Sequence, residues 1–132
     1  MEILLPEQIL PINADTSFPI VYKDSAGTQL DLHNYDIIMT FRYTSAKGQV
    51  AIIACTDHTL VDPVDTAAPY TTIQINPDGT GLITFPYSQM KLLQDKTGYY
   101  DTIIIPKATH VRDRAAGPDA YGEFTLDKGT TR

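Results

Sequence analysis

The residues best suited to chemistry lie in one short polar stretch near the C-terminal end of the sequence. His110, Arg112, Asp113 and Arg114 fall within five consecutive positions of the segment THVRDRAAG. Histidine and aspartate can transfer protons and arginine can hold an anion, so this stretch is the first candidate for an active site. An enzyme also needs a nucleophile or a metal held beside such groups, and the sequence offers none here. The alternative is that the stretch is only a loop between two strands.

The remaining reactive residues form no recognisable catalytic set. His33 and His58 stand alone in polar segments and lack the HxH or HxxxH spacing of metal ligands. The glycines form no phosphate-binding motif, and no serine lies on a strand-to-helix elbow. Cys55 sits in the apolar run VAIIAC and is expected to be a core residue. We predict no enzyme, no cofactor and no metal site. The open alternative is an enzyme whose three histidines, including His110, converge with carboxylates from distant loops.

Length and charge limit the class of protein. A chain of 132 residues is expected to form one domain over residues 1–132. Sixteen acidic against ten basic residues give a net charge of -6, which provides no general attraction to nucleic acid or anionic lipid. No apolar run approaches the roughly 20 residues that span a bilayer, and the N-terminus lacks the pattern of a secretory signal. With a single cysteine, the sequence predicts a protein made in a reducing cytoplasm that binds neither nucleic acid nor membrane.

Short apolar runs separated by proline and glycine predict an all-β protein. SFPIVYK and YDIIMTFRYT alternate with period two, which predicts strands with one buried face each. In the second run, the side opposite the core is expected to carry Ile38, Thr40 and Arg42. The turn SAKG should join this strand to QVAIIAC as an antiparallel hairpin. In TTIQINPDGTGLITF, proline and glycine predict the turn of a second hairpin.

The rest of the chain predicts loops, one helix and a closing pair of strands. TDHTLVDPVDTAAPY is a long acidic connection that should lie on the surface, and PYSQMKLLQDKTG has the features of a short helix. The last strands are GYYDTIIIP and AYGEFTLD, separated by an insertion from about Lys107 to Asp119. The predicted fold is therefore all-β: a single antiparallel, immunoglobulin-like β-sandwich with one short helix and a long insertion in the last hairpin.

The order of these segments resembles the small β-sandwich domains of tailed-bacteriophage virion proteins, such as the N-terminal domain of baseplate upper proteins and related tail or fibre-attachment modules. The matching residues are Leu30, Asp31, Leu32, Tyr35, Gly81, Leu82, Ile83, Thr84, Gly98, Tyr99, Tyr100, Asp101, Gly122, Phe124, Thr131 and Arg132. The resemblance implies a structural subunit without catalysis, assembled in several copies in the host cytoplasm and located in the virion. Its implied partners are other virion structural proteins and copies of itself.

Partner contacts are expected in the two long loops. The insertion exceeds the roughly two to five residues of an ordinary hairpin loop, and loops of that excess tend to be functional or disordered. Arginine supplies a planar donor fork suited to interfaces. The predicted contact residues are Tyr70, His110, Val111, Arg112 and Arg114. The alternative function is a carbohydrate-binding β-sandwich that contacts host-surface glycans, since some of the eight tyrosines could stack on sugars.

Overall fold

The fold is built almost entirely of β-strands, as a computed structural model shows for residues 2–3, 9–11, 15–24, 26–43, 49–90, 97–115 and 121–127. These ranges contain eleven strands: β1 (Glu2–Ile3), β2 (Ile9–Pro11), β3 (Thr16–Lys23), β4 (Gln29–Leu30), β5 (Tyr35–Tyr43), β6 (Val50–Cys55), β7 (Tyr70–Ile75), β8 (Gly81–Phe85), β9 (Thr97–Pro106), β10 (Asp113–Arg114) and β11 (Gly122–Asp127). They also contain the helix α1 (Tyr87–Met90) and the 3-10 helices η1 (Leu32–Asn34), η2 (His58–Leu60) and η3 (Pro63–Asp65). The predicted all-β class is confirmed.

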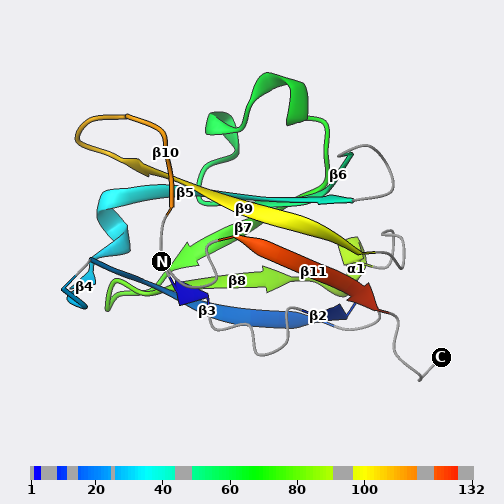
Figure 1. Ribbon diagram of the computed structural model, residues 1–132, viewed down its shortest axis with the longest axis horizontal. Helices are drawn as coiled ribbons and strands as arrows, with labels where there is room; N and C mark the ends of the chain where they lie inside the picture. The colour runs from blue at the N-terminus through cyan, green and yellow to red at the C-terminus, as the bar shows by residue number, and fades with distance from the viewer. Residues whose placement is uncertain are drawn as a thin grey trace.

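The strands form one curled, mixed sheet, which corrects the expectation of a purely antiparallel sandwich (Figure 1). The order is β1-β3-β8-β7-β6-β5-β9-β11-β2, with β4 added on β3 and β10 on β9. Two pairings are parallel, β6 with β7 and β2 with β11. A parallel pair cannot be closed by a tight turn and needs a long connection. Residues 56–69 are that connection for β6 and β7. Because this loop is long, β7 can run parallel to β6.

Both hairpins expected from local sequence are present. β7 and β8 pair antiparallel with Ile73 opposite Ile83, and Gly79 adopts a φ of 87° in the turn between them. β5 and β6 also pair antiparallel, while the turn SAKG lies outside the described residues. Turn chemistry at Gly79 thus explains the β7–β8 pairing, and the pairing of β5 with β6 agrees with the prediction.

An aromatic cluster forms the centre of the main core. Phe41 of β5 is 1% exposed, and its ring lies 5.6 Å from the Phe85 ring of β8, 5.3 Å from Tyr100 and 5.2 Å from Phe124. Phe85 also contacts Phe18 of β3, with ring centroids 6.0 Å apart. Because strands from distant parts of the sheet meet at these rings, the curl of the sheet encloses the core.

A second, smaller apolar cluster lies on the outer face of the sheet. Ile38, Ile53 and Ile105 are buried there beneath Val61 of the long connection, together with Cys55. The expectation that the outer side of β5 is open is therefore wrong at Ile38, which is only 5% exposed. The acidic connection buries this side because it folds back over β5 and β6 and presents apolar side chains between its aspartates.

The last predicted elements are also found, with changes at their ends. β9 and β11 form the closing hairpin, with Tyr100 opposite Gly122, and the insertion pairs back on β9 through β10. The helix is described only as α1, because residues 91–96 lie outside the described ranges. No helix in these ranges is long and apolar enough to cross a membrane.

Candidate functional site

The connection between β6 and β7 is ordered by its own aspartates. The Oδ1 of Asp57 accepts hydrogen bonds from Thr59 N–H (3.0 Å) and from the Thr59 hydroxyl (2.7 Å), and Asp62 Oδ1 accepts from Val64 N–H (3.1 Å). These two residues cap η2 and η3. The bonds from Thr59 hold the pKa of Asp57 below its usual value. Two of the aspartates in this loop, Asp57 and Asp62, therefore serve as helix caps.

The insertion between β9 and β11 is anchored near both ends of its described part. Lys107 N–H donates to the carbonyl of Asn34 (3.0 Å), and Ala115 N–H donates to the carbonyl of Thr102 (2.8 Å). Ala115 is buried in the main core. Between these anchors, His110 adopts a φ of 57°, a conformation uncommon outside glycine, and Val111 is 55% exposed. The insertion therefore projects a fixed turn from the sheet.

Two arginines join the connection to the rest of the molecule. The Nη2 of Arg42, on β5, lies 3.2 Å from Asp65 Oδ2, and Arg112 donates a hydrogen bond from its Nη2 to the carbonyl oxygen of Leu60. Between them is a cleft of about 310 Å³. The cleft is lined by Ile38, Thr40, Arg42, Val61, Asp62, Asp65, Asp101, Ile103 and Arg112. The arginines thus hold the connection at two points across an open cleft.

The cleft combines an apolar part with charges of both signs. Three aspartates and two arginines line it together with isoleucine and valine side chains. Such a site can receive a charged side chain of a partner, and the aspartates and arginines of the cleft would set the orientation of that side chain. Sequence reasoning missed Arg42, Asp65 and Asp101 as site residues. One signal was present: alternation in β5 already placed Arg42 on the side away from the core.

The structure brings only part of the predicted contact set together. Arg112 lies in the cleft, His110 and Val111 are exposed beside it in the insertion, and Arg114 of β10 sits over the Tyr121 ring at 4.5 Å. Tyr70 instead lies at the start of β7, 39% exposed and stacked on His58 with centroids 3.8 Å apart. Hydrogen bonds and ring contacts among the described residues do not join Tyr70 to the insertion.

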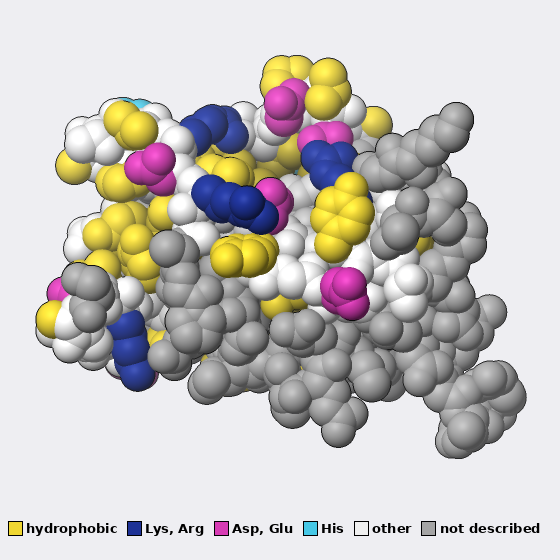
Figure 2. Space-filling view, in the orientation of Figure 1, with side chains coloured by type: hydrophobic (Ala, Val, Ile, Leu, Met, Phe, Trp, Pro, Cys, Tyr) yellow, Lys and Arg dark blue, Asp and Glu magenta, His cyan; other side chains and the backbone are white. Residues whose placement is uncertain are grey.

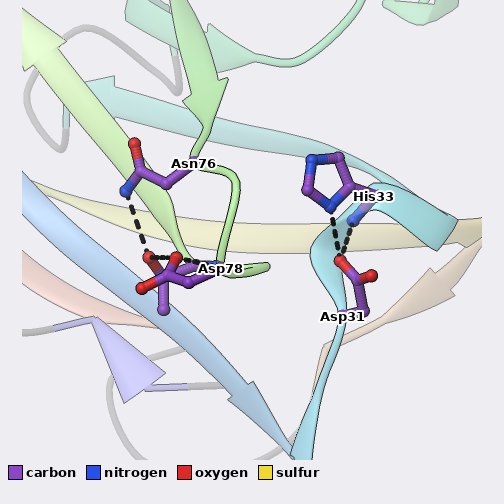
Figure 3. Close-up of polar contacts among 5 residues, drawn as sticks. Asp31, His33, Asn76 and Asp78 are labelled. Atoms are coloured by element: carbon purple, nitrogen blue, oxygen red, sulfur yellow. Dashed lines mark hydrogen bonds and ion pairs between the residues drawn. The ribbon is translucent and has the colours of Figure 1, made fainter.

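The three histidines occupy three different settings. His33 Nδ1 lies 2.6 Å from Asp31 Oδ1, which also accepts the His33 backbone N–H (Figure 3). These bonds lower the pKa of Asp31, the residue that caps η1. His58 stacks on Tyr70, and His110 is exposed in the insertion. Within the described part of the chain, no group of three or more His, Cys, Asp or Glu side chains could hold a metal ion.

The corner shown in Figure 3 is a pair of interlocked turns. Asp78 Oδ1 accepts from the N–H and hydroxyl of Thr80 (3.0 and 2.6 Å), which lowers the pKa of Asp78. The Leu32 N–H donates to the carbonyl of Gly79 (3.0 Å), and a Cβ added at Gly79 would lie 2.9 Å from Asp31 Oδ1. The polar groups therefore serve to pack the β7–β8 turn against η1.

Cys55 is a core residue, as the sequence predicted. It is 1% exposed within the second cluster, and burial raises the pKa of its thiol to about 11. A thiol that stays protonated at neutral pH is a poor nucleophile.

Comparison with known proteins adds no relative: no protein-family model matches the chain, and no curated protein is detectably similar to it.

Proposed function

We propose that the chain is a structural protein of a tailed-bacteriophage virion, a connector or fibre-attachment subunit of the tail, baseplate or neck. It acts by protein–protein contacts repeated over several copies. The observation that carries this proposal is the docking of the insertion on the long connection through Arg112 and Leu60. This hydrogen bond joins two loops that lie 52 positions apart in the sequence, and holding a surface in its bound shape lowers the entropy cost of docking.

The ordered motifs give the second line of support. Gly98, Tyr99, Tyr100 and Asp101, which carry part of the resemblance to phage virion domains, lie on the central strand β9. The strand order supports the predicted immunoglobulin-like arrangement. The runs β1-β3-β8-β7 and β6-β5-β9-β11 follow the order of the two sheets of a variable-type immunoglobulin domain. We infer a sandwich of that type whose two sheets are joined along one side by β6–β7 pairing.

A carbohydrate-binding function is the second candidate, because several tyrosines are exposed. Two of them have one ring face occupied: His58 stacks on Tyr70, and Arg114 lies over Tyr121. Sugar binding by aromatic residues needs an open ring face, so these contacts favour a protein partner over a glycan. Tyr99, 49% exposed, is the strongest remaining position for a sugar. Glycan-array binding that is lost in Tyr99→Ala would favour this second function.

The test of the virion proposal starts from particles. Particles purified by density gradient from the source culture should contain the chain in several copies, as measured by quantitative mass spectrometry. Purified Arg112→Ala/Arg114→Ala protein should fold normally, because both side chains are exposed, yet it should fail to co-assemble with the particle proteins that retain the wild-type chain. Absence of the chain from purified particles would refute the proposal, and so would unchanged co-assembly of the double variant.

A further inference from the structure

One face of the sheet combines tyrosine with arginine on the outer side of its central strands. We define the Tyr–Arg face as Arg42, Tyr99, Asp101, Arg114, Tyr121 and Glu123. Register places Arg42 opposite Tyr99 and Tyr99 opposite Glu123, and Arg114 lies opposite Ile103 on the same strand β9. In Figure 2, basic and acidic patches alternate with apolar side chains on the visible face of the molecule. Side chains of β5, β9, β10 and β11 thus lie on the same outer side of the sheet, together with Tyr121.

The composition of this face is that of an interface. Tyr99 and Tyr121 are 49% and 54% exposed. Tyrosine and arginine are enriched in protein interfaces, whereas lysine, aspartate and glutamate are depleted there, so Asp101 and Glu123 are the exceptions on this face. Strands β5, β9, β10 and β11 contain no lysine, although the chain has six. A sheet face exposed only to water would be expected to carry the reverse pattern.

Both arginines of the face are already held in place. Arg42 is bound to Asp65, and Arg114 lies over the Tyr121 ring at 4.5 Å. A long side chain held before docking loses less conformational entropy when a partner arrives. The Arg114 guanidinium carries five N–H donors that a partner carboxylate can engage.

The charges of the face point to a second copy of this chain as the partner. Two arginines and two acids give the six residues of the Tyr–Arg face a net charge of zero, and Asp65, the ion-pair partner of Arg42, brings the region to -1, whereas the chain carries -6. Two copies that each carry a net charge of -6 repel one another at long range, and a region of low net charge opposes their approach less than an acidic one would. A partner with a large net charge of either sign would have no electrostatic complementarity with this face.

We propose that two copies associate through their Tyr–Arg faces about a two-fold axis that runs across the strands at the level of Asp101. Arg114 and Glu123 lie on either side of that level, four residues apart along β9 by register, or about 13 Å. The axis places Arg114 of each copy against Glu123 of the other, and Tyr99 against Ile103. Contact is confined to β9, β10 and β11, because on β5 the same axis sets Arg42 opposite Ile38, which Val61 covers. One isologous interface then contains two identical ion pairs.

This geometry also brings the two Asp101 carboxylates toward each other at the axis. Like charges facing across an interface oppose association. The arrangement therefore makes an unusual prediction, that removal of the Asp101 charge strengthens the dimer. The inference deepens the proposed function, since it names a copy of the chain as the partner of one surface.

The test is sedimentation velocity of the full chain from about 10 µM to about 1 mM, which detects dissociation constants in the micromolar to millimolar range. Arg114→Glu and Glu123→Arg should each weaken the association constant by about tenfold or more, and the double variant R114E/E123R should recover most of the loss. D101N should tighten the dimer. The matched control is K23E, which makes the same charge change as R114E at an exposed position of β3. It should leave association unchanged.

Several results would overturn the inference. They are a wild-type chain that stays monomeric at every concentration, a dimer unaffected by R114E, a double variant no better than the single ones, and weaker association in D101N. Tyr99→Ser provides a second probe if a charge reversal disturbs folding, and it too should weaken the dimer. The outcome is separable from that of the virion proposal, because particle content is measured independently of self-association.

Discussion

Gly98 is the position where one added methyl group should damage the fold most. A Cβ at this residue would lie 2.0 Å from the carbonyl oxygen of Arg42 and 2.8 Å from two ring carbons of Phe124. Ordinary contact begins at about 3.4 Å, so β5 and β9 would have to separate by about 1.4 Å at this point. The oxygen belongs to the backbone of a central strand and cannot rotate away. Gly98→Ala therefore forces a backbone shift.

The size of the effect follows from what that shift disturbs. Overpacking a core costs about 1–3 kcal/mol, and each strand hydrogen bond weakened adds up to about 1 kcal/mol. We expect Gly98→Ala to lower the free energy of unfolding by about 3 kcal/mol or more. In a domain of this size, that corresponds to a Tm lower by about 10 °C. Differential scanning calorimetry and urea unfolding would both measure the change.

Gly27→Ala is the matched control for this prediction. Gly27 has a φ of 84° but no atom within 4 Å of an added Cβ. Its replacement by alanine should cost only about 1–2 kcal/mol, from the strained backbone alone. If Gly98→Ala proved no more destabilising than Gly27→Ala, the close approach of β5, β9 and Phe124 would be refuted as the reason for glycine.

Three further predictions concern burial and titration. Phe41→Ala should lower the free energy of unfolding by about 3–5 kcal/mol in urea titrations, because it empties the centre of the aromatic cluster; a loss below about 1 kcal/mol would contradict that position. At about pH 8, a thiol reagent should label Cys55 only as fast as the protein unfolds, since burial raises its pKa to about 11; rapid labelling of folded protein would disprove this. Because the bonds from Thr59 lower the folded-state pKa of Asp57, their stabilisation exists above the ordinary carboxyl pKa and is lost as the pH falls through the folded value. The urea midpoint of Asp57→Asn should consequently fall less than that of the wild type between about pH 7 and about pH 2, and equal falls would count against it.

Features governed by near neighbours could be predicted from the sequence. The β7–β8 hairpin depends on a proline and a glycine within one turn, and alternation in β5 placed Phe41 inward and Arg42 outward. Each of these depends on residues a few positions apart. The capping aspartates of the long connection follow the same logic, since Asp57 bonds a residue two positions away.

Features that depend on long-range contact could not be predicted. Ile38 has the alternation of an exposed residue, yet it is buried because Val61 folds over it from the connection. Asp65 had no mark in the sequence to distinguish it from neighbouring aspartates, and its pairing with Arg42 spans 23 positions. The cleft and the parallel β6–β7 pairing arise from the path of this one loop. Single-sequence patterns carry no information about that path.

In the segment Gly98-Tyr99-Tyr100-Asp101, alternate residues have different roles, two in the packing of the fold and two in association. Alternation along β9 directs Gly98 and Tyr100 inward, where they are buried against neighbouring strands, and directs Tyr99 and Asp101 to the Tyr–Arg face. Substitutions at the inward positions should thus lower the stability of the fold, and substitutions at the outward positions should change self-association. Tyr100→Ala should lower stability by about 3–5 kcal/mol, as expected for a buried aromatic residue. Tyr99→Ala should leave the Tm nearly unchanged and weaken self-association instead. If both variants were equally destabilised, the outward tyrosine would have a structural role, which would count against an interface on this face.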